Sequence, residues 1–188
     1  MKAGWALPAA GLAGTATLAA AGVPHRVLGK TGLKVAPVGY GAGFTPDPSV
    51  IHQAVDMGVN YFDTARSYSA GNSERLLGGA LKGLRDKVVV TSKTSSKTRA
   101  DALSDIDASL KTLGMDHIDI WMLHARDTAA AIGDEMVDAL LTAKKQGKTR
   151  FIGVSTHDPN AVVDHILKIG KLDVVLITYS FAMGTTRD

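Results

Sequence analysis

Short apolar runs alternate with helical patterns along most of this 188-residue chain. The runs show little polar alternation, as expected for strands that are covered on both faces. Repeating β–α units of this kind imply a parallel sheet with right-handed crossovers. The strand-like runs are PVGYGAG, VNYFDTA, KVVVTSK, IDIWMLH, TRFIGVST and LDVVLITYS. Helical patterns follow the first five of them, at DPSVIHQAVDMG and at about 72–83, 98–114, 130–147 and 158–170.

This order favours an α/β fold of the (β/α)8 TIM-barrel type. A doubly wound dinucleotide fold is disfavoured, because GYGAGF continues into a loop and no G-x-G-x-x-G turn opens a helix. Two short segments around Gly29–Gly32 predict an N-terminal β-hairpin that closes the barrel floor. A complete barrel needs eight strands and about 250 residues. We therefore expect an incomplete barrel, with about six of eight β–α units, whose open sheet edges invite self-association.

The first 22 residues differ in composition from the rest of the chain. MKAGWALPAAGLAGTATLAAAG resembles the apolar region and small-residue cleavage site of an export signal. Pro8 and the many alanines and glycines make it a poor candidate for a stable membrane span. The segment favours an exported, periplasmic protein over a cytoplasmic one, the alternative being a disordered or misassigned N-terminus. The barrel domain is expected over residues 23–188.

Composition excludes several classes of site. The chain has no cysteine, so disulfides, iron–sulfur clusters and thiolate catalysis are excluded. The net charge is +3 and the basic residues are scattered, which disfavours nucleic-acid binding. No metal site is predicted, because four of the histidines lack metal-like spacing with carboxylates: His52, His117, His157 and His165.

Polar side chains stand where consecutive predicted strands end. They are Asp63, Lys93, His124 and Ser155, and Tyr68 lies in the loop just after Asp63. In a (β/α) barrel the reactive residues sit at these carboxyl ends. The pattern therefore predicts a reactive cluster on one rim of the barrel.

The residue types of this cluster suggest proton transfer to a carbonyl oxygen. The pKa of an unperturbed tyrosine is about 10, and a lysine ammonium close to Tyr68 is expected to lower it. Asp63 would hold Lys93 charged and in place, and His124 would orient the carbonyl. A hydride must come from a cofactor, since no side chain supplies one.

Each residue also has a structural interpretation when it is taken singly. Asp63 could cap a turn, Tyr68 could be a half-buried loop aromatic, and Lys93 could be a solvated strand end. His124 could be a core histidine. Glu74 is assigned to the start of a helix, where a carboxylate suits the helix dipole.

Several motifs in order carry a family resemblance. GVNYFDTARSY with GNSERLLGGAL, then VVVTSK, DHIDIWMLH and RFIGVS, resemble the aldo-keto reductase superfamily of NADPH-using barrel oxidoreductases. The opening VLGKTGLKVAPVGYGAG is similar to the family's entry hairpin and first strand. The resemblance implies a catalytic tetrad of Asp63, Tyr68, Lys93 and His124. It also implies NADPH-dependent reduction of a small-molecule aldehyde or ketone to an alcohol.

The resemblance also implies cofactor contacts, at Gly43, Phe44, Asp63, Ser155 and Thr156. Thr156 stands where the family has an asparagine that binds the nicotinamide amide, and Leu176 stands where it has a glutamine. In the family, the seventh and eighth strands supply a tyrosine that stacks on the nicotinamide and a basic loop for the 2′-phosphate. The sequence stops before these strands, at Asp188. The alternative expectation is therefore a truncated, catalytically silent relative with a structural or partner-binding role.

Overall fold

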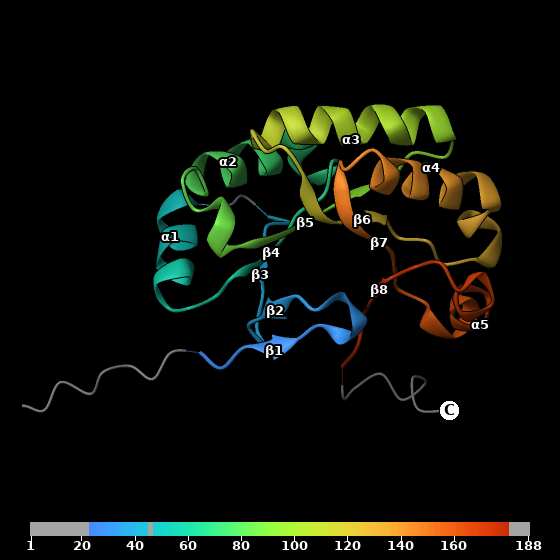
Figure 1. The fold of residues 1–188 in the computed structure, drawn as a ribbon, viewed down its shortest axis with the longest axis horizontal. Helices are drawn as coiled ribbons and strands as arrows, with labels where there is room; N and C mark the ends of the chain where they lie inside the picture. The colour runs from blue at the N-terminus through green and yellow to red at the C-terminus, as the bar shows by residue number, and fades with distance from the viewer. Residues whose placement is uncertain (1–22, 45–46, 181–188) are drawn as a thin grey trace, which may run out of the picture.

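A computed structural model of the chain describes residues 23–44 and 47–180. The predicted export signal in residues 1–22 lies outside these ranges. Six parallel strands form one curved sheet in sequential order, from β3 to β8 (Figure 1). The strands are β3 Tyr40–Gly41, β4 Tyr61–Asp63, β5 Val89–Thr94, β6 Ile118–Leu123, β7 Thr149–Thr156 and β8 Val174–Ile177. All six coincide with predicted strand-like runs.

Five α-helices connect the strands and cover the outer side of the curved sheet (Figure 1). They are α1 Pro48–Asp56, α2 Asn72–Ala80, α3 Arg99–Leu113, α4 Asp134–Lys145 and α5 Pro159–Ile169. Short 3-10 turns add η1 Gly29–Thr31, η2 Tyr68–Gly71, η3 Arg85–Lys87 and η4 Ala129–Ile132. The predicted helices are confirmed, with ends up to a few residues shorter than the periodicity suggests.

Polar side chains fix where three of the helices begin. Asp47 accepts a hydrogen bond from the amide of Ser49 at the start of α1. Thr98 and Asp158 do the same for α3 and α5, accepting from the third residue after each. These bonds satisfy amides that have no partner within the helix. The caps therefore fix the first residues of α1, α3 and α5.

The predicted N-terminal hairpin is confirmed. Strand β1, Arg26–Val27, pairs antiparallel with β2, Lys34–Val35. Leu33 packs against Ile120 and Met122 on the inner face of the sheet. Neighbouring side chains of β6 point the other way, and Trp121 joins the larger core between sheet and helices. The hairpin thus covers apolar side chains on the inner face, as expected for a barrel floor.

The sheet stays open between its two edge strands, β3 and β8. On β8, the side chains of Val175, Leu176 and Ile177 are exposed. A cavity of about 390 Å³ lies between these edges and the hairpin, and Asp63 is part of its wall. The architecture is thus an incomplete (β/α)8 barrel, as predicted. Within the described ranges, no helix is both long and apolar enough to span a bilayer.

Candidate active site

A buried ion pair joins the first two predicted site residues. Asp63 ends β4, and Lys93 lies near the end of the adjacent strand β5. Lys93 Nζ donates to Asp63 Oδ1 at 2.5 Å and to the carbonyl of Thr64 at 2.9 Å. The Lys93 side chain is 1% exposed and that of Asp63 is 18% exposed. Pairing through parallel strands therefore brings together two residues that lie 30 positions apart.

Burial dominates the ionisation of both partners. The pKa of Asp63 is raised because burial outweighs the stabilising charge and hydrogen bond of Lys93. The pKa of Lys93 is lowered because its own burial outweighs the charge and hydrogen bond of Asp63. Each charge thus depends on the other to offset the cost of leaving water.

Tyr68 lies against this pair from the loop that follows β4. Lys93 Nζ is 5.0 Å from the centroid of the Tyr68 ring. Ser69 and Ala70, which follow Tyr68, have φ values of 49° and 53°. Residues other than glycine rarely adopt this left-handed conformation, so the turn that places Tyr68 is held in strain by its surroundings.

The ionisation of Tyr68 differs from the sequence-based expectation. Its pKa is raised, first by burial and then by the negative charge of Asp63. The pKa is therefore not lowered as expected, because burial of the phenol and the charge of Asp63 dominate. Tyr68 therefore keeps its proton at neutral pH, as a proton donor must.

His124 completes the cluster at the end of β6. Its ring meets the Tyr68 ring edge-on, with centroids 5.4 Å apart and an angle of 81°. Nδ1 lies 3.2 Å from Ser67 Oγ and 3.3 Å from Ser95 Oγ. The pKa of His124 is lowered to about 4, chiefly by burial and then by the positive charges of Lys93, His157 and Arg126. The imidazole is therefore neutral at pH 7, with one nitrogen as donor and one as acceptor.

The structure brings together Asp63, Tyr68, Lys93 and His124. The predicted cofactor contacts, in contrast, differ in their exposure and in their distance from this cluster. Gly43 lies beside Tyr68, since a Cβ atom on it would be 3.6 Å from the tyrosine ring. Phe44 is 93% exposed. The Phe44 side chain therefore packs little against the described part of the protein.

Ser155 and Thr156 are buried, and their hydroxyls bond within the protein. Ser155 Oγ accepts from the amide of Ala125 at 2.8 Å. Thr156 Oγ1 donates to Asp127 Oδ1 at 2.9 Å and accepts from the amide of Asp158 at 3.0 Å. These bonds tie the end of β7 to the loop after His124, and the cofactor contacts at Ser155 and Thr156 stay predictions.

One buried atom of the cluster lacks a hydrogen-bond donor in the part of the chain that the structure describes. Asp63 Oδ2 is inaccessible to solvent and has no hydrogen-bond partner among the described residues. A buried carboxylate oxygen without a donor is costly, and a ligand hydroxyl would satisfy it. Asp63 also lines the cavity between β3 and β8, whereas Tyr68, Lys93 and His124 do not.

The sequence did not reveal a hydrogen-bond network of Glu74, Arg66 and Ser92 close to the cluster. Glu74 lies in the first turn of α2, as predicted, and its side chain is fully buried. Its carboxylate accepts from Arg66 Nη1 at 2.6 Å and from Ser92 Oγ at 2.7 Å. Arg66 and Ser92 are close in sequence to Tyr68 and Lys93, so this network fixes the two segments relative to each other. A helical pattern alone cannot reveal such a pairing.

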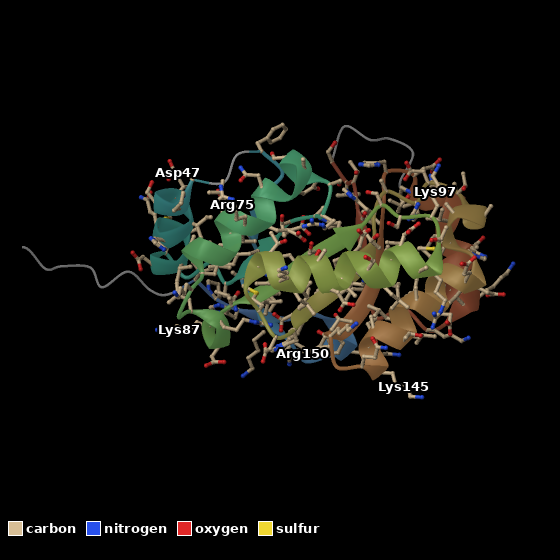
Figure 2. The ribbon with its side chains drawn as sticks, turned by 90° about the horizontal axis from the view of Figure 1, so that it is seen from above. Asp47, Arg75, Lys87, Lys97, Lys145 and Arg150 are labelled. Atoms are coloured by element: carbon tan, nitrogen blue, oxygen red, sulfur yellow. The ribbon has the colours of Figure 1, made fainter. Side chains whose placement is uncertain are left out.

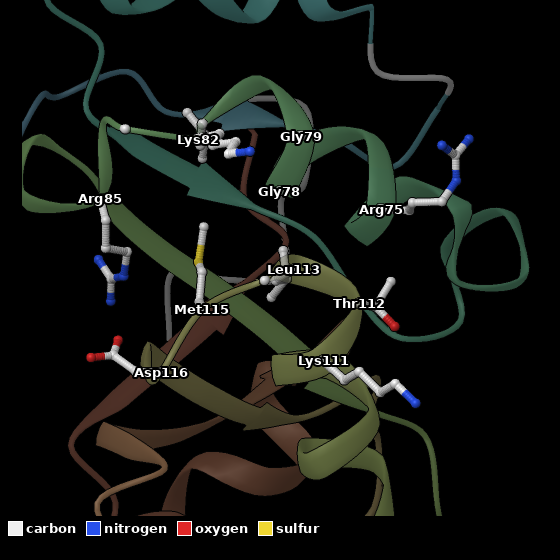
Figure 3. A pocket seen from close by; sticks show the side chains of 13 residues that line it. Arg75, Gly78, Gly79, Lys82, Arg85, Lys111, Thr112, Leu113, Met115 and Asp116 are labelled. Atoms are coloured by element: carbon white, nitrogen blue, oxygen red, sulfur yellow. The ribbon is translucent and has the colours of Figure 1, made fainter.

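Another groove lies away from the cluster, between α2 and α3 (Figure 3). It measures about 680 Å³, and none of the predicted site residues lines it. Gly78 lets the two helices approach closely there, because a Cβ atom on it would overlap the carbonyl of Leu113. Over residues 23–44 and 47–180, no group of three or more histidines or acidic residues is arranged to hold a metal ion.

The fold and the cluster together define a protein of the (β/α)-barrel class, with candidate proton-transfer residues at the carboxyl ends of its strands. Residues 47–188 match the model of the aldo/keto reductase family, which is more than half of the chain. The chain therefore belongs to the aldo/keto reductase family, a family of oxidoreductases.

Known members of the family show how far the similarity extends. L-galactose dehydrogenase of Arabidopsis thaliana is 37% identical over 177 residues, which covers 80% of this chain and 54% of that protein. The holo form of aldo-keto reductase AKR11C1 from Bacillus halodurans superimposes with a TM-score of 0.76 at 28% identity, covering 84% of this chain and 58% of that one. An aldo-keto reductase from Klebsiella pneumoniae, solved in complex with NADPH, gives a TM-score of 0.68 at 26% identity over 79% of this chain and 56% of that one. The chain thus spans about half the length of the curated relatives it matches.

Proposed function

We propose that this protein reduces the carbonyl group of a small aldehyde or ketone to an alcohol, with NADPH as the hydride donor. The observation that carries the proposal is the contact of Tyr68 with both the Lys93–Asp63 pair and His124. Membership of an oxidoreductase family supports it. When bound, the nicotinamide cofactor supplies the hydride that no side chain can supply.

Each member of the cluster has a distinct role in the proposed reaction. Tyr68 holds the transferable proton on its phenol oxygen and passes it to the carbonyl oxygen of the substrate. The ammonium of Lys93 then stabilises the phenolate that Tyr68 leaves behind. Asp63 keeps Lys93 charged, and the neutral ring of His124 donates an N–H to the carbonyl oxygen. Asp63, Gly43 and Phe44 would contact the cofactor at the same rim.

The direct test measures NADPH oxidation by the purified protein with a panel of small neutral aldehydes. We expect turnover by the wild type and a loss of at least about 100-fold in kcat for Tyr68→Phe. A parallel fluorescence titration with NADPH and with NADH measures cofactor affinity and preference. Absence of both NADPH oxidation and NADPH binding would overturn the proposal.

Partner binding without catalysis is a second candidate function. The observation that favours it is the open sheet edge, where Val175, Leu176 and Ile177 expose apolar surface beside unpaired backbone groups of β8. Such edges pair readily with another strand, and a second copy of this chain offers the same edge. Light scattering tests this, with Leu176→Lys expected to shift a dimer toward monomer. A wild type that stays monomeric up to high concentration would contradict self-association.

Export of the chain through residues 1–22 also remains a proposal. It is supported by the small, apolar composition of that segment. Expression in a bacterium, followed by fractionation and N-terminal sequencing, tests it. A periplasmic product that begins near residue 23 is expected, whereas an intact N-terminus in the cytoplasm would contradict export.

A further inference from the structure

Arg126 is a buried cation that the proposed reaction does not use. It follows His124 by two residues, and its amide donates to the carbonyl of Ser155 at 2.8 Å. Arg126 is 7% exposed. Its Nη2 donates to the carbonyl of Ser96, and its Nε is buried without an acceptor in the described part of the chain. A guanidinium has five N–H donors, and the bond to Ser96 uses one of them.

Arg126 also lacks a counter-charge in the part of the chain that the structure describes. Among the ion pairs formed by the described residues, none includes Arg126. Buried charges in proteins are normally paired, because an unpaired one loses its hydration without compensation. Burial lowers the pKa of Arg126, because it disfavours the charged form of the guanidinium. An anion bound from solution would remove this cost.

A cavity of about 300 Å³ opens beside Arg126. Lys97 also lines it, and the side chain of Lys97 has no ion-pair or hydrogen-bond partner within residues 23–44 and 47–180. Glu135 is the acidic residue of the wall, and its Oε1 already accepts from the amide of Arg99 at 3.0 Å. The remaining wall is small or apolar, formed by Ala130, Ala131, Gly133 and Met136. Two cations face one carboxylate, so the cavity favours a single negative charge.

The two loops that carry Lys97 and Arg126 also carry residues that belong to or contact the candidate active site. The loop after β5 carries Ser95, which contacts His124, followed by Ser96 and Lys97. The loop after β6 carries His124 and then Arg126. Lys87 and Arg150 lie at the amino ends of β5 and β7. Figure 2 shows Lys97 on the opposite side of the molecule from these two residues. Lys97 therefore lies at the carboxyl rim, where the cluster is.

We propose that Arg126 and Lys97 form an anion subsite, and that the substrates of this protein are carbonyl compounds that also carry a carboxylate. This inference rests on the proposed carbonyl reduction. The planar fork of a guanidinium matches a carboxylate with two parallel hydrogen bonds, and the ammonium of Lys97 adds a second charge. Binding the carboxylate here fixes one end of the substrate beside the residue that orients its carbonyl.

The kinetic test compares acids with their neutral esters. Succinic and glutaric semialdehydes are assayed beside their methyl esters, with the same cofactor. We expect the wild type to favour the acids by about tenfold or more in kcat/KM, mainly through KM. Arg126→Gln should lose this preference and retain activity on the esters, and Lys97→Gln should reduce it. Equal turnover of acids and esters by the wild type would overturn the proposal.

Two controls separate carboxylate binding at Arg126 from a general loss of activity. Lys87→Gln removes a cation at the opposite edge and should leave the acid preference unchanged. If Arg126 were only structural, Arg126→Gln would lower the activity on acids and esters equally. Should Arg126→Gln fail to fold, the Lys97→Gln variant still carries the test.

A binding measurement keeps the subsite distinct from the reaction. Succinate titrated into ¹⁵N-labelled protein should shift the side-chain Nε–H resonance of Arg126, and Lys97→Gln should weaken that shift. If no aldehyde is reduced but this shift occurs, carbonyl reduction fails and the subsite stands. If neutral aldehydes are reduced and succinate produces no shift at Arg126, the subsite fails and carbonyl reduction stands.

Discussion

Lys93 Nζ lies 2.5 Å from Asp63 Oδ1 and 5.0 Å from the ring of Tyr68, so one buried ion pair supports the candidate proton donor. The two charges come from adjacent parallel strands, and each offsets the burial of the other. Because Tyr68 contacts this pair, a change at Asp63 affects both the stability of the fold and the chemistry of the tyrosine.

Asp63→Asn is expected to destabilise the protein by roughly 3 kcal/mol, because it leaves the Lys93 ammonium buried without a counter-charge. Urea unfolding followed by circular dichroism measures the change. Asp138→Asn is a matched control, since Arg99 Nε lies 2.7 Å from Asp138 Oδ2 but both side chains are largely exposed. That variant should lose less than about 1 kcal/mol. Equal losses in the two variants would contradict a special cost at Asp63.

The lowered pKa of His124, about 4, predicts a pH dependence of stability. The folded protein binds the His124 proton more weakly than the unfolded chain, whose histidine pKa is about 6.5. Its contribution is therefore fully present above about pH 6.5 and is lost as the pH falls toward about 4. Unfolding free energies from pH 7 to 4.5 should decrease more steeply for the wild type than for His124→Gln. An NMR titration that gives His124 a midpoint near 6.5 would refute this.

Ser67 and Ser95 are expected to set the tautomer of His124. Both hydroxyls lie within 3.3 Å of Nδ1, so either can donate to it and leave the N–H on Nε2. The Ser67→Ala/Ser95→Ala double variant should lose about tenfold or more in kcat, with little change in KM for neutral aldehydes. Long-range ¹H–¹⁵N spectra of the ring should show a mixture of tautomers. Ser95→Thr keeps a hydroxyl and should retain most of the activity.

The sequence predicts the fold and the clustering of the site well, for a physical reason. Carboxyl ends of parallel strands share one rim, so strand order alone brings Asp63, Lys93 and His124 together. The periodicity of the helical segments likewise suffices to place all five helices. These features depend on local patterns and on the handedness of β–α units, which a sequence displays directly.

Features that depend on burial could not be predicted in this way. The pKa of Tyr68 is raised rather than lowered, because tertiary packing buries the phenol and places it near the charge of Asp63. Glu74 was correctly placed at a helix start, but its pairing with Arg66 comes from a loop fold with no sequence signature. Arg126 stands two positions after the predicted His124, and this proximity to the rim was the one signal that could have marked it.

Adjacent glycines in α2 provide a matched test of the packing between α2 and α3. A Cβ atom at Gly78 would overlap the carbonyl of Leu113, which is backbone and cannot rotate away (Figure 3). Gly78→Ala should therefore cost about 1–3 kcal/mol, because the helices must separate. A Cβ atom at Gly79 would meet no atom within 4 Å. Gly79→Ala should stabilise the protein by about 0.5–1 kcal/mol, because alanine loses less backbone entropy in a helix.

Thermal unfolding of the two variants should therefore show melting temperatures on opposite sides of the wild type. If both variants melt together, the close approach of the helices at Gly78 does not exist in solution.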